Sequence, residues 1–193
     1  MEDGRVNSND DRLGCTVLLT GLPAAGKSTL AQSLIARLQR AGRKATLLDG
    51  DELRSLLSPD LGYTRDDRIL QCRRAGYIAG EVARHGGITV CALIAPYHEA
   101  REEIRRLSSA QGLFLMVYVS TPVDVCMLRD RKGLYARARA GVITDLTGVG
   151  ESYEVPAEPA LVVDMASMDP DVTADAILEQ LIGLGCLGRQ LTN

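Results

Sequence analysis

The chain has 193 residues, of which 46% are hydrophobic and 24% are charged, and its formal net charge at pH 7 is −3. This length and hydrophobic share suit one globular domain with a substantial core and leave little room for a second. The small negative charge does not favour nucleic acid or an anionic membrane surface as a partner. No apolar run approaches the roughly 20 residues that a membrane-spanning helix needs. We therefore expect neither nucleic-acid nor membrane partners.

The first residues are polar and acidic and lack the basic, apolar and small-residue sections of a secretory signal. We expect residues 1–13 to be a disordered tail, residues 14–187 to form a single domain, residues 188–193 to be a C-terminal tail, and the protein to be cytoplasmic. An odd set of scattered cysteines argues against both a disulfide framework and a zinc site; it comprises Cys15, Cys72, Cys91, Cys126 and Cys186.

Apolar runs and helical periodicity alternate along the domain. Strands are expected at 16–20, 45–48, 88–94, 113–119 and 160–163, with helices at about 29–42, 64–84, 98–107, from Thr121-Pro122 onward, and at 171–184. This alternation predicts an α/β fold of the P-loop NTPase type: a five-stranded, mostly parallel sheet with helices on both faces. Residues 129–159 interrupt the pattern with a long glycine- and proline-containing stretch, which we interpret as a lid segment.

The first strand runs into a loop with the pattern GxxxxGK[ST] and then into a helix, which is the context of a phosphate-binding loop. Its backbone N–H groups and the start of the following helix are expected to surround the phosphates of a nucleoside triphosphate. Lys27 is expected to contact the β and γ phosphates, and the Ser28 hydroxyl to ligate Mg²⁺. The predicted phosphate-binding residues here are Gly21, Leu22, Pro23, Ala24, Ala25, Gly26, Lys27, Ser28 and Thr29.

Two carboxylates, Asp49 and Asp51, follow the second predicted strand, at the edge where open α/β sheets bind ligands. They suit two tasks of phosphoryl transfer: accepting the proton of the attacking hydroxyl, and orienting hydrated Mg²⁺. The alternative interpretation is an Asp-Gly turn in which Asp51 is the N-cap of a helix beginning at Glu52.

Arginines form a second group around residues 54–74. Arg68 and the pair Arg73-Arg74 cannot all face one side of a helix, so some are expected to be surface charges and others to grip an acidic acceptor. The lid segment also opens with a basic run, residues 129–139, which is typical of a lid that closes over triphosphate.

Taken together, these residues resemble the adenylylsulfate kinase family, which uses ATP to phosphorylate the 3′-hydroxyl of adenosine 5′-phosphosulfate. The resemblance covers about residues 15–184. It rests on GLPAAGKST (21–29), LDGDELR (48–54), LGYTRDDR (61–68), IAPY (94–97), RDRKGLYARARAG (129–141) and LTGVGESYEVP (146–156).

The resemblance implies roles for individual residues. Asp49 would be the catalytic base, acting with Lys27, and Asp51 would assist at the metal, possibly through water. Arg129 and Lys132 would belong to the ATP side and the lid. The implied acceptor-binding residues are Asp51, Arg54, Tyr63, Arg68, Gln71, Ile94, Ala95, Leu134 and Leu146. Within this set, Arg54 and Arg68 would hold the phosphosulfate end and Tyr63 would stack on adenine. ATP is the implied co-substrate and Mg²⁺ the cofactor; a homodimer and an ATP sulfurylase are implied partners.

Four positions depart from the family pattern. Ala95 replaces a common Ser, so phosphate must pass directly from ATP to the acceptor, and Gln71 replaces a usual Asn. In the lid segment Leu146 stands where Phe is usual, and Thr144 where Lys is usual. These changes keep two alternatives open: the same kinase chemistry on another nucleotide or phosphorylated acceptor, and a non-catalytic nucleotide-binding regulatory module.

Overall fold

The structure, a computed structural model, describes residues 13–188. The expected tails therefore lie outside the described residues, apart from residues 13 and 188 themselves. None of the helices formed between residues 13 and 188 has the length and apolar character that crossing a bilayer requires.

A single five-stranded sheet forms the centre of the molecule. Its strands are β1 (Cys15–Gly21), β2 (Ala45–Asp49), β3 (Ile88–Leu93), β4 (Leu113–Val119) and β5 (Leu161–Val163). They lie in the order β2-β3-β1-β4-β5, and every neighbouring pair is parallel. The sequence predicted the fold class correctly, and the sheet is wholly rather than mostly parallel. All five carboxyl ends therefore meet at one edge, where loops following different strands approach one another.

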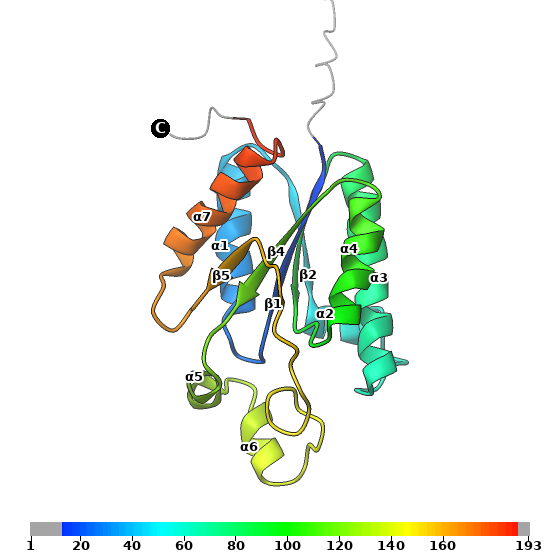
Figure 1. The fold of residues 1–193 in the computed structure, drawn as a ribbon, viewed down its shortest axis with the longest axis vertical. Helices are drawn as coiled ribbons and strands as arrows, with labels where there is room; N and C mark the ends of the chain where they lie inside the picture. The colour runs from blue at the N-terminus through cyan, green and yellow to red at the C-terminus, as the bar shows by residue number, and fades with distance from the viewer. Residues whose placement is uncertain (1–12, 189–193) are drawn as a thin grey trace, which may run out of the picture.

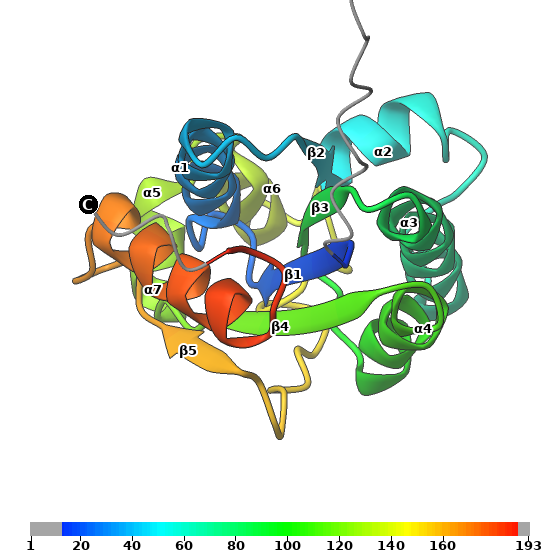
Figure 2. The ribbon, with the colours of Figure 1, turned by 90° about the horizontal axis from the view of Figure 1, so that it is seen from above.

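Helices cover both faces of this sheet (Figures 1 and 2). Seen from above, α1 and α7 lie over one face and α3 and α4 over the other, while α2 lies beside the β2 edge. The helices are α1 (Lys27–Arg40), α2 (Gly50–Leu56), α3 (Arg65–Arg84), α4 (His98–Ser109), α5 (Val123–Arg129), α6 (Leu134–Arg139) and α7 (Pro170–Gly183).

Alternation along β1 divides the core into two halves. Val17 and Leu19 pack with the α1 and α7 side, whereas Leu18 packs with the α3 and α4 side, and all three side chains are fully buried. A strand whose both faces are covered reads as the continuous apolar run seen in the sequence. Packing on both faces therefore holds the strands in place, and the loops at their carboxyl ends begin from these fixed positions.

Local capping explains where the helices begin. Thr64 and Asp67 form a reciprocal capping box at the start of α3, and Asp169 caps α7 with Pro170 in the first turn. The alternative interpretation of Asp51 as an N-cap is wrong: α2 begins at Gly50, and Asp49 is its cap, accepting from the N–H of Asp51 at 3.0 Å. Asp49 is favoured because its extended backbone leaves the carboxylate within reach of that N–H.

The lid segment contains more regular structure than the sequence indicated. Its first part holds α6, and its second part is a loop closed by a short bridge between Thr147 and Glu151. In Figure 1 α5, α6 and this loop lie together below the carboxyl edge of the sheet. The segment therefore lies over the edge at which the P-loop and the Asp49–Asp51 turn also lie.

Candidate active site

Carbonyl groups of the loop between β1 and α1 already accept hydrogen bonds from side chains. The Tyr135 hydroxyl donates to the Pro23 carbonyl at 3.1 Å, and the Thr121 hydroxyl donates to the Ala25 carbonyl at 2.8 Å. Gly26 caps α1 with φ 106°, a conformation that other residues rarely adopt. The first-turn N–H groups of α1 have no intrahelical acceptors, so they remain available for an anion.

Lys27 occupies the middle of this loop and is only 8% exposed. Its ammonium donates to the carbonyls of Gly21 at 2.9 Å and Leu22 at 2.7 Å. Burial lowers the pKa of Lys27 to about 8, an effect only partly offset by neighbours that include Asp49. The lysine is thus a poorly solvated cation that a polyphosphate would stabilise.

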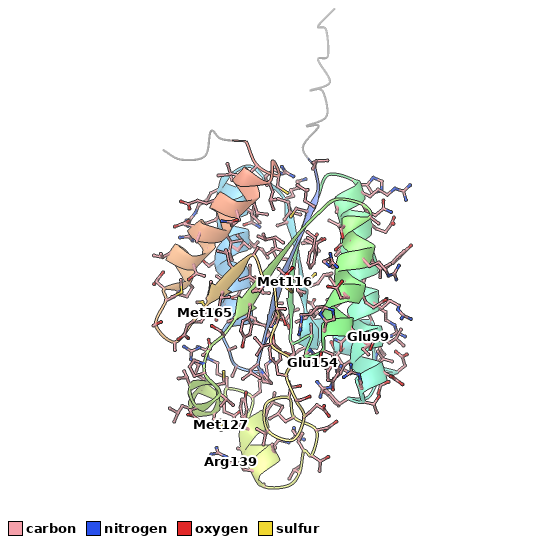
Figure 3. All side chains as sticks on the ribbon, in the orientation of Figure 1. Glu99, Met116, Met127, Arg139, Glu154 and Met165 are labelled. Carbon is pink, nitrogen blue, oxygen red and sulfur yellow. The ribbon has the colours of Figure 1, made fainter. Side chains whose placement is uncertain are left out.

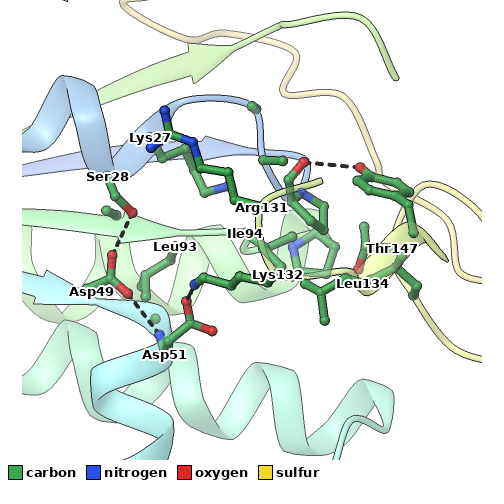
Figure 4. Close-up of a pocket in the computed structure, with 18 of the residues that line it drawn as sticks. Lys27, Ser28, Asp49, Asp51, Leu93, Ile94, Arg131, Lys132, Leu134 and Thr147 are labelled. Carbon is green, nitrogen blue, oxygen red and sulfur yellow. Dashed lines mark hydrogen bonds and ion pairs between the residues drawn. The ribbon is translucent and has the colours of Figure 1, made fainter. Parts of the chain in front are cut away.

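A chain of hydrogen bonds links the loop to the turn after β2 (Figure 4). The Ser28 hydroxyl donates to one carboxylate oxygen of Asp49 at 2.7 Å, while the other oxygen of Asp49 accepts the Asp51 N–H at 3.0 Å. Asp49 therefore has a fixed orientation, and Ser28 and Asp49 face the same space. Asp51 is exposed and reaches toward the lid segment.

The oxygen atoms of Ser28 and Asp49 suit Mg²⁺, which takes some of its ligands from water and phosphate, better than they suit a metal held by protein ligands alone. Within residues 13–188 there is no group of three or more His, Cys, Asp or Glu side chains arranged to hold a metal. The Ser28 hydroxyl beside the Asp49 carboxylate instead matches Mg²⁺, which keeps several waters and takes phosphate oxygens as ligands.

Arginines from α2 and α3 form the wall opposite the P-loop. Arg68 is 7% exposed, and it donates to the carbonyls of Tyr63 and Asp145, both at 2.8 Å. The Arg54 guanidinium lies 4.4 Å from the centre of the Tyr63 ring and also bonds Gln71. Arg73 and Arg74 instead pair on the surface, with Glu103 and Asp60, as expected for some of these arginines; that the others grip an acceptor stays a prediction.

The lid segment closes the space from the side of the triphosphate loop. Lys132 forms an ion pair with Asp51 across the opening. Arg129 contacts the Ala25 carbonyl at 3.5 Å, and Asp130 caps α6 by accepting the N–H groups of Tyr135 and Ala136. Arg139, at the far end of α6, points away from the body of the molecule (Figure 3).

The phosphate-binding loop, the Asp49–Asp51 turn, Arg54, Arg68 and the first part of the lid segment surround one cavity of about 860 Å³. Every site residue predicted from the sequence lines this cavity except Gly21 and Leu22. The carbonyls of these two residues accept hydrogen bonds from the Lys27 ammonium. A cavity of this size, with a phosphate-binding loop at one end and arginines at the other, suits two nucleotide-sized ligands meeting at Asp49.

Comparisons with known proteins support the same interpretation. Residues 13–164 match the adenylylsulphate kinase family. The chain is 41% identical to the adenylyl-sulfate kinase of Paraburkholderia xenovorans, over 89% of this chain and 95% of that protein. The chain belongs to the adenylylsulfate kinase family. Among solved structures, the Mycobacterium tuberculosis APS kinase CysC in complex with AMPPNP and APS has a TM-score of 0.83 and 37% identity, covering 88% of this chain and 98% of that one.

The adenylylsulfate kinase domain also occurs in longer relatives. The chain is 45% identical to the bifunctional enzyme NodQ of Azospirillum brasilense over 84% of its own length, but it spans only 26% of NodQ. It spans about a third of the fungal relatives named sulfate adenylyltransferase.

Three of the departures from the adenylylsulfate kinase pattern can be described in the structure. Gln71 does not present a free amide: its oxygen accepts from Arg54, and its nitrogen donates to the Gly50 carbonyl at 2.9 Å. Ala95 is one of two non-glycine residues between 13 and 188 with positive φ, at 43°. Leu146 is 8% exposed and lines the cavity while packing into the core.

Several residues in or next to the cavity were not singled out from the sequence. Tyr135 bonds the phosphate-binding loop, Thr147 bonds Arg68 at 3.2 Å, and Tyr153 bonds Thr20 at 2.9 Å. Tyr135 and Tyr153 lie inside motifs quoted for the family, but a tyrosine in a motif does not reveal which distant group it contacts. Their partners lie 112 and 133 residues away in the sequence.

Proposed function

We propose that this chain transfers the γ-phosphoryl group of ATP to the 3′-hydroxyl of adenosine 5′-phosphosulfate, giving 3′-phosphoadenosine 5′-phosphosulfate and ADP. The observation that carries the proposal is the placement of Asp49 between the phosphate-binding loop and a wall of arginines within one cavity. Phosphoryl transfer requires donor and acceptor oxygens in line, charge neutralisation and exclusion of water. The loop, the arginines and the lid segment are the parts that would meet these requirements.

On the donor side, the triphosphate would bind the N–H groups at the start of α1. Lys27 would leave the Gly21 and Leu22 carbonyls for the β and γ phosphates, because a phosphate anion is a stronger acceptor for an ammonium. Ser28 would hold Mg²⁺, with Asp51 contributing through water. The ion would neutralise charge on the β and γ oxygens.

On the acceptor side, Arg54 and Arg68 would bind the phosphosulfate end, with Tyr63 against the adenine. The 3′-hydroxyl would then lie near Asp49, whose carboxylate would accept its proton. Lys132 would exchange its pairing with Asp51 for the bound phosphates as the lid segment closes.

An assay of ADP release tests this proposal. The wild-type chain, with Mg²⁺ and ATP, should release ADP in a saturable manner at micromolar adenosine phosphosulfate, and far more slowly without acceptor. ADP release with another nucleotide but not with adenosine phosphosulfate would show that the chain uses a different acceptor. ATP binding with no transfer to any acceptor would instead indicate a regulatory module.

The same kinase chemistry on a different acceptor is the second candidate. It is favoured by Gln71, whose amide is engaged with Arg54 and Gly50, and by Leu146, which supplies no aromatic face. We also propose that an ATP sulfurylase supplies the acceptor, since that reaction makes adenosine phosphosulfate, that the protein acts in the cytoplasm, and that two copies associate.

A further inference from the structure

A strained turn follows β3 at the acceptor wall. Ile94 and Ala95 both line the cavity, and Ala95 has a left-handed backbone with φ 43° while being only 3% exposed. A Cβ atom makes this conformation unfavourable, so a non-glycine residue keeps it only where its surroundings impose it.

Two buried side chains impose the turn by binding its carbonyl groups. The Thr20 hydroxyl donates to the Ile94 carbonyl at 2.6 Å, and Arg101 donates to the Ala95 carbonyl at 3.0 Å. Thr20 is fully buried and Arg101 is 2% exposed, so water does not compete for these carbonyls.

Tyr153 completes this arrangement from the far end of the lid segment. Its hydroxyl lies 2.9 Å from that of Thr20. A threonine hydroxyl has one proton, and Thr20 donates it to Ile94, so Tyr153 must be the donor to Thr20. Burial raises the pKa of Tyr153 to about 12, which keeps the phenol protonated at neutral pH.

The residues around Tyr153 are joined to the same turn. Its ring stacks on Tyr118, with centroids 5.8 Å apart. The next residue, Glu154, donates its N–H to the Pro96 carbonyl at 2.8 Å and accepts the His98 N–H at 2.6 Å. Figure 3 shows Glu154 near Glu99 at the start of α4. The exit of the lid segment and the turn after β3 are therefore joined by several hydrogen bonds.

We propose that Tyr153, acting through Thr20, is a positioning residue for the acceptor, because it fixes the Ile94–Ala95 backbone that forms part of the acceptor wall. Tyr153 does not itself line the cavity. This inference rests on the proposed function for its kinetic consequence, but the coupling between the two segments exists whatever the acceptor is.

The kinetic test compares Tyr153→Phe with the wild type. Loss of one buried hydrogen bond should raise KM for the acceptor about fivefold, with KM for ATP unchanged within about twofold. Tyr118→Phe is the matched control: it removes a phenol from the adjacent ring, and among the described residues that phenol makes no hydrogen bond to a side chain or to the backbone. Thr20→Val removes both the bond to Ile94 and the acceptor of the Tyr153 hydroxyl, so it should raise KM for the acceptor at least as much as Tyr153→Phe does. Adding Tyr153→Phe to Thr20→Val should change KM no further, and Thr20→Ser should keep the wild-type KM.

Hydrogen exchange followed by mass spectrometry provides a second readout that needs no acceptor. Tyr153→Phe should speed exchange in peptides covering 94–98 and 151–156, and Tyr118→Phe should not. If the wild type does not use adenosine phosphosulfate, the proposed function fails, and hydrogen exchange alone decides the coupling. Unchanged exchange in both peptides, or an equal rise in KM for ATP and acceptor, would overturn the inference.

Discussion

At the scale of single residues, the site depends on side chains whose orientations are set by hydrogen bonds within the protein. Asp49 is the clearest case, since one oxygen caps α2 and the other accepts from Ser28. The helix cap is therefore Asp49 rather than Asp51, and the same carboxylate is the proposed catalytic base. A carboxylate fixed by its backbone loses little freedom when the acceptor arrives.

Replacing Asp49 by Asn should separate these two roles. Asparagine caps helices as well as aspartate does, so the free energy of unfolding should change little. Turnover should fall by at least about 10²-fold because the amide cannot accept the proton, while the Kd for ATP stays within about threefold. Single-turnover transfer and calorimetric ATP titration provide the two measurements. An Asp49→Asn variant with normal turnover would exclude the proposed base.

Lys27 should make ATP binding depend on pH. Its pKa in the folded protein is about 8, against 10.5 as its ordinary value, so bound phosphates should raise it and draw in a proton. The Kd for ATP should rise about fivefold between pH 8 and pH 9. Calorimetry at pH 8.5 in two buffers of different ionisation enthalpy should show proton uptake, and its absence would contradict the assignment.

The same shift has the opposite sign for the stability of the ligand-free protein. Between about pH 8 and pH 10.5 the unfolded chain binds more protons at this lysine than the folded chain does. The contribution of Lys27 to stability therefore rises with pH across that window.

At the scale of elements, the strands and most helices could be predicted from sequence because their signals are local. Continuous apolar runs marked β1, β3 and β4, and helical spacing marked α1, α3 and α7. The short helix α6 was not predicted as a separate element, since its start depends on Asp130 and on Gly133 with φ 64°. The bond between Tyr153 and Thr20 could not be predicted, because it depends on tertiary contact.

Two buried threonines in the sheet are expected to lower the free energy of unfolding. Thr16 and Thr89 are register partners on β1 and β3, both fully buried, and neither hydroxyl has a hydrogen-bond partner among the described residues. An unpaired buried hydroxyl carries a desolvation cost that a methyl group does not.

Thr16→Val and Thr89→Val should each raise the free energy of unfolding by about 1 kcal/mol, because valine has nearly the same shape and suits a strand. Urea denaturation measures the change, and KM for ATP should stay constant because both residues lie at the end of the sheet away from the cavity. Thr46→Val, on the edge strand and exposed to water, is the control expected to change stability little. Destabilisation by either buried replacement would indicate a hydrogen bond to an ordered water.

At the scale of the whole molecule, the cavity draws on elements from both faces of the sheet and on residues from Pro23 to Pro170. The P-loop leads into α1 on one face of the sheet, while Arg68 and Gln71 come from α3 on the other. The motifs indicated these residues one by one. Their meeting in a single cavity follows from the strand order, which places β1 between β3 and β4. That order does not follow from local periodicity.

Arg43 joins distant parts of the fold at the opposite end. It is 6% exposed and donates to the carbonyls of Cys186 and of Gly86, the latter at 2.9 Å. Arg43→Met should lower the free energy of unfolding by about 2–3 kcal/mol, because the buried Cys186 carbonyl and the partly buried Gly86 carbonyl lose a charged donor. Thermal and urea denaturation would show the loss, whereas Lys44→Met, at an exposed neighbour, should have little effect. A marked rise in KM from Arg43→Met would contradict a purely structural role.

The position of Arg43 has a consequence for how this domain could be joined to other domains. The described chain enters at the amino end of β1 and leaves after Cys186 beside Arg43, and both points lie across the sheet from the cavity mouth. A second domain joined at either point would extend away from the mouth and leave the passage of ATP and acceptor open. The same geometry would let this domain work as a detachable module, consistent with relatives in which it forms only a quarter to a third of a longer polypeptide.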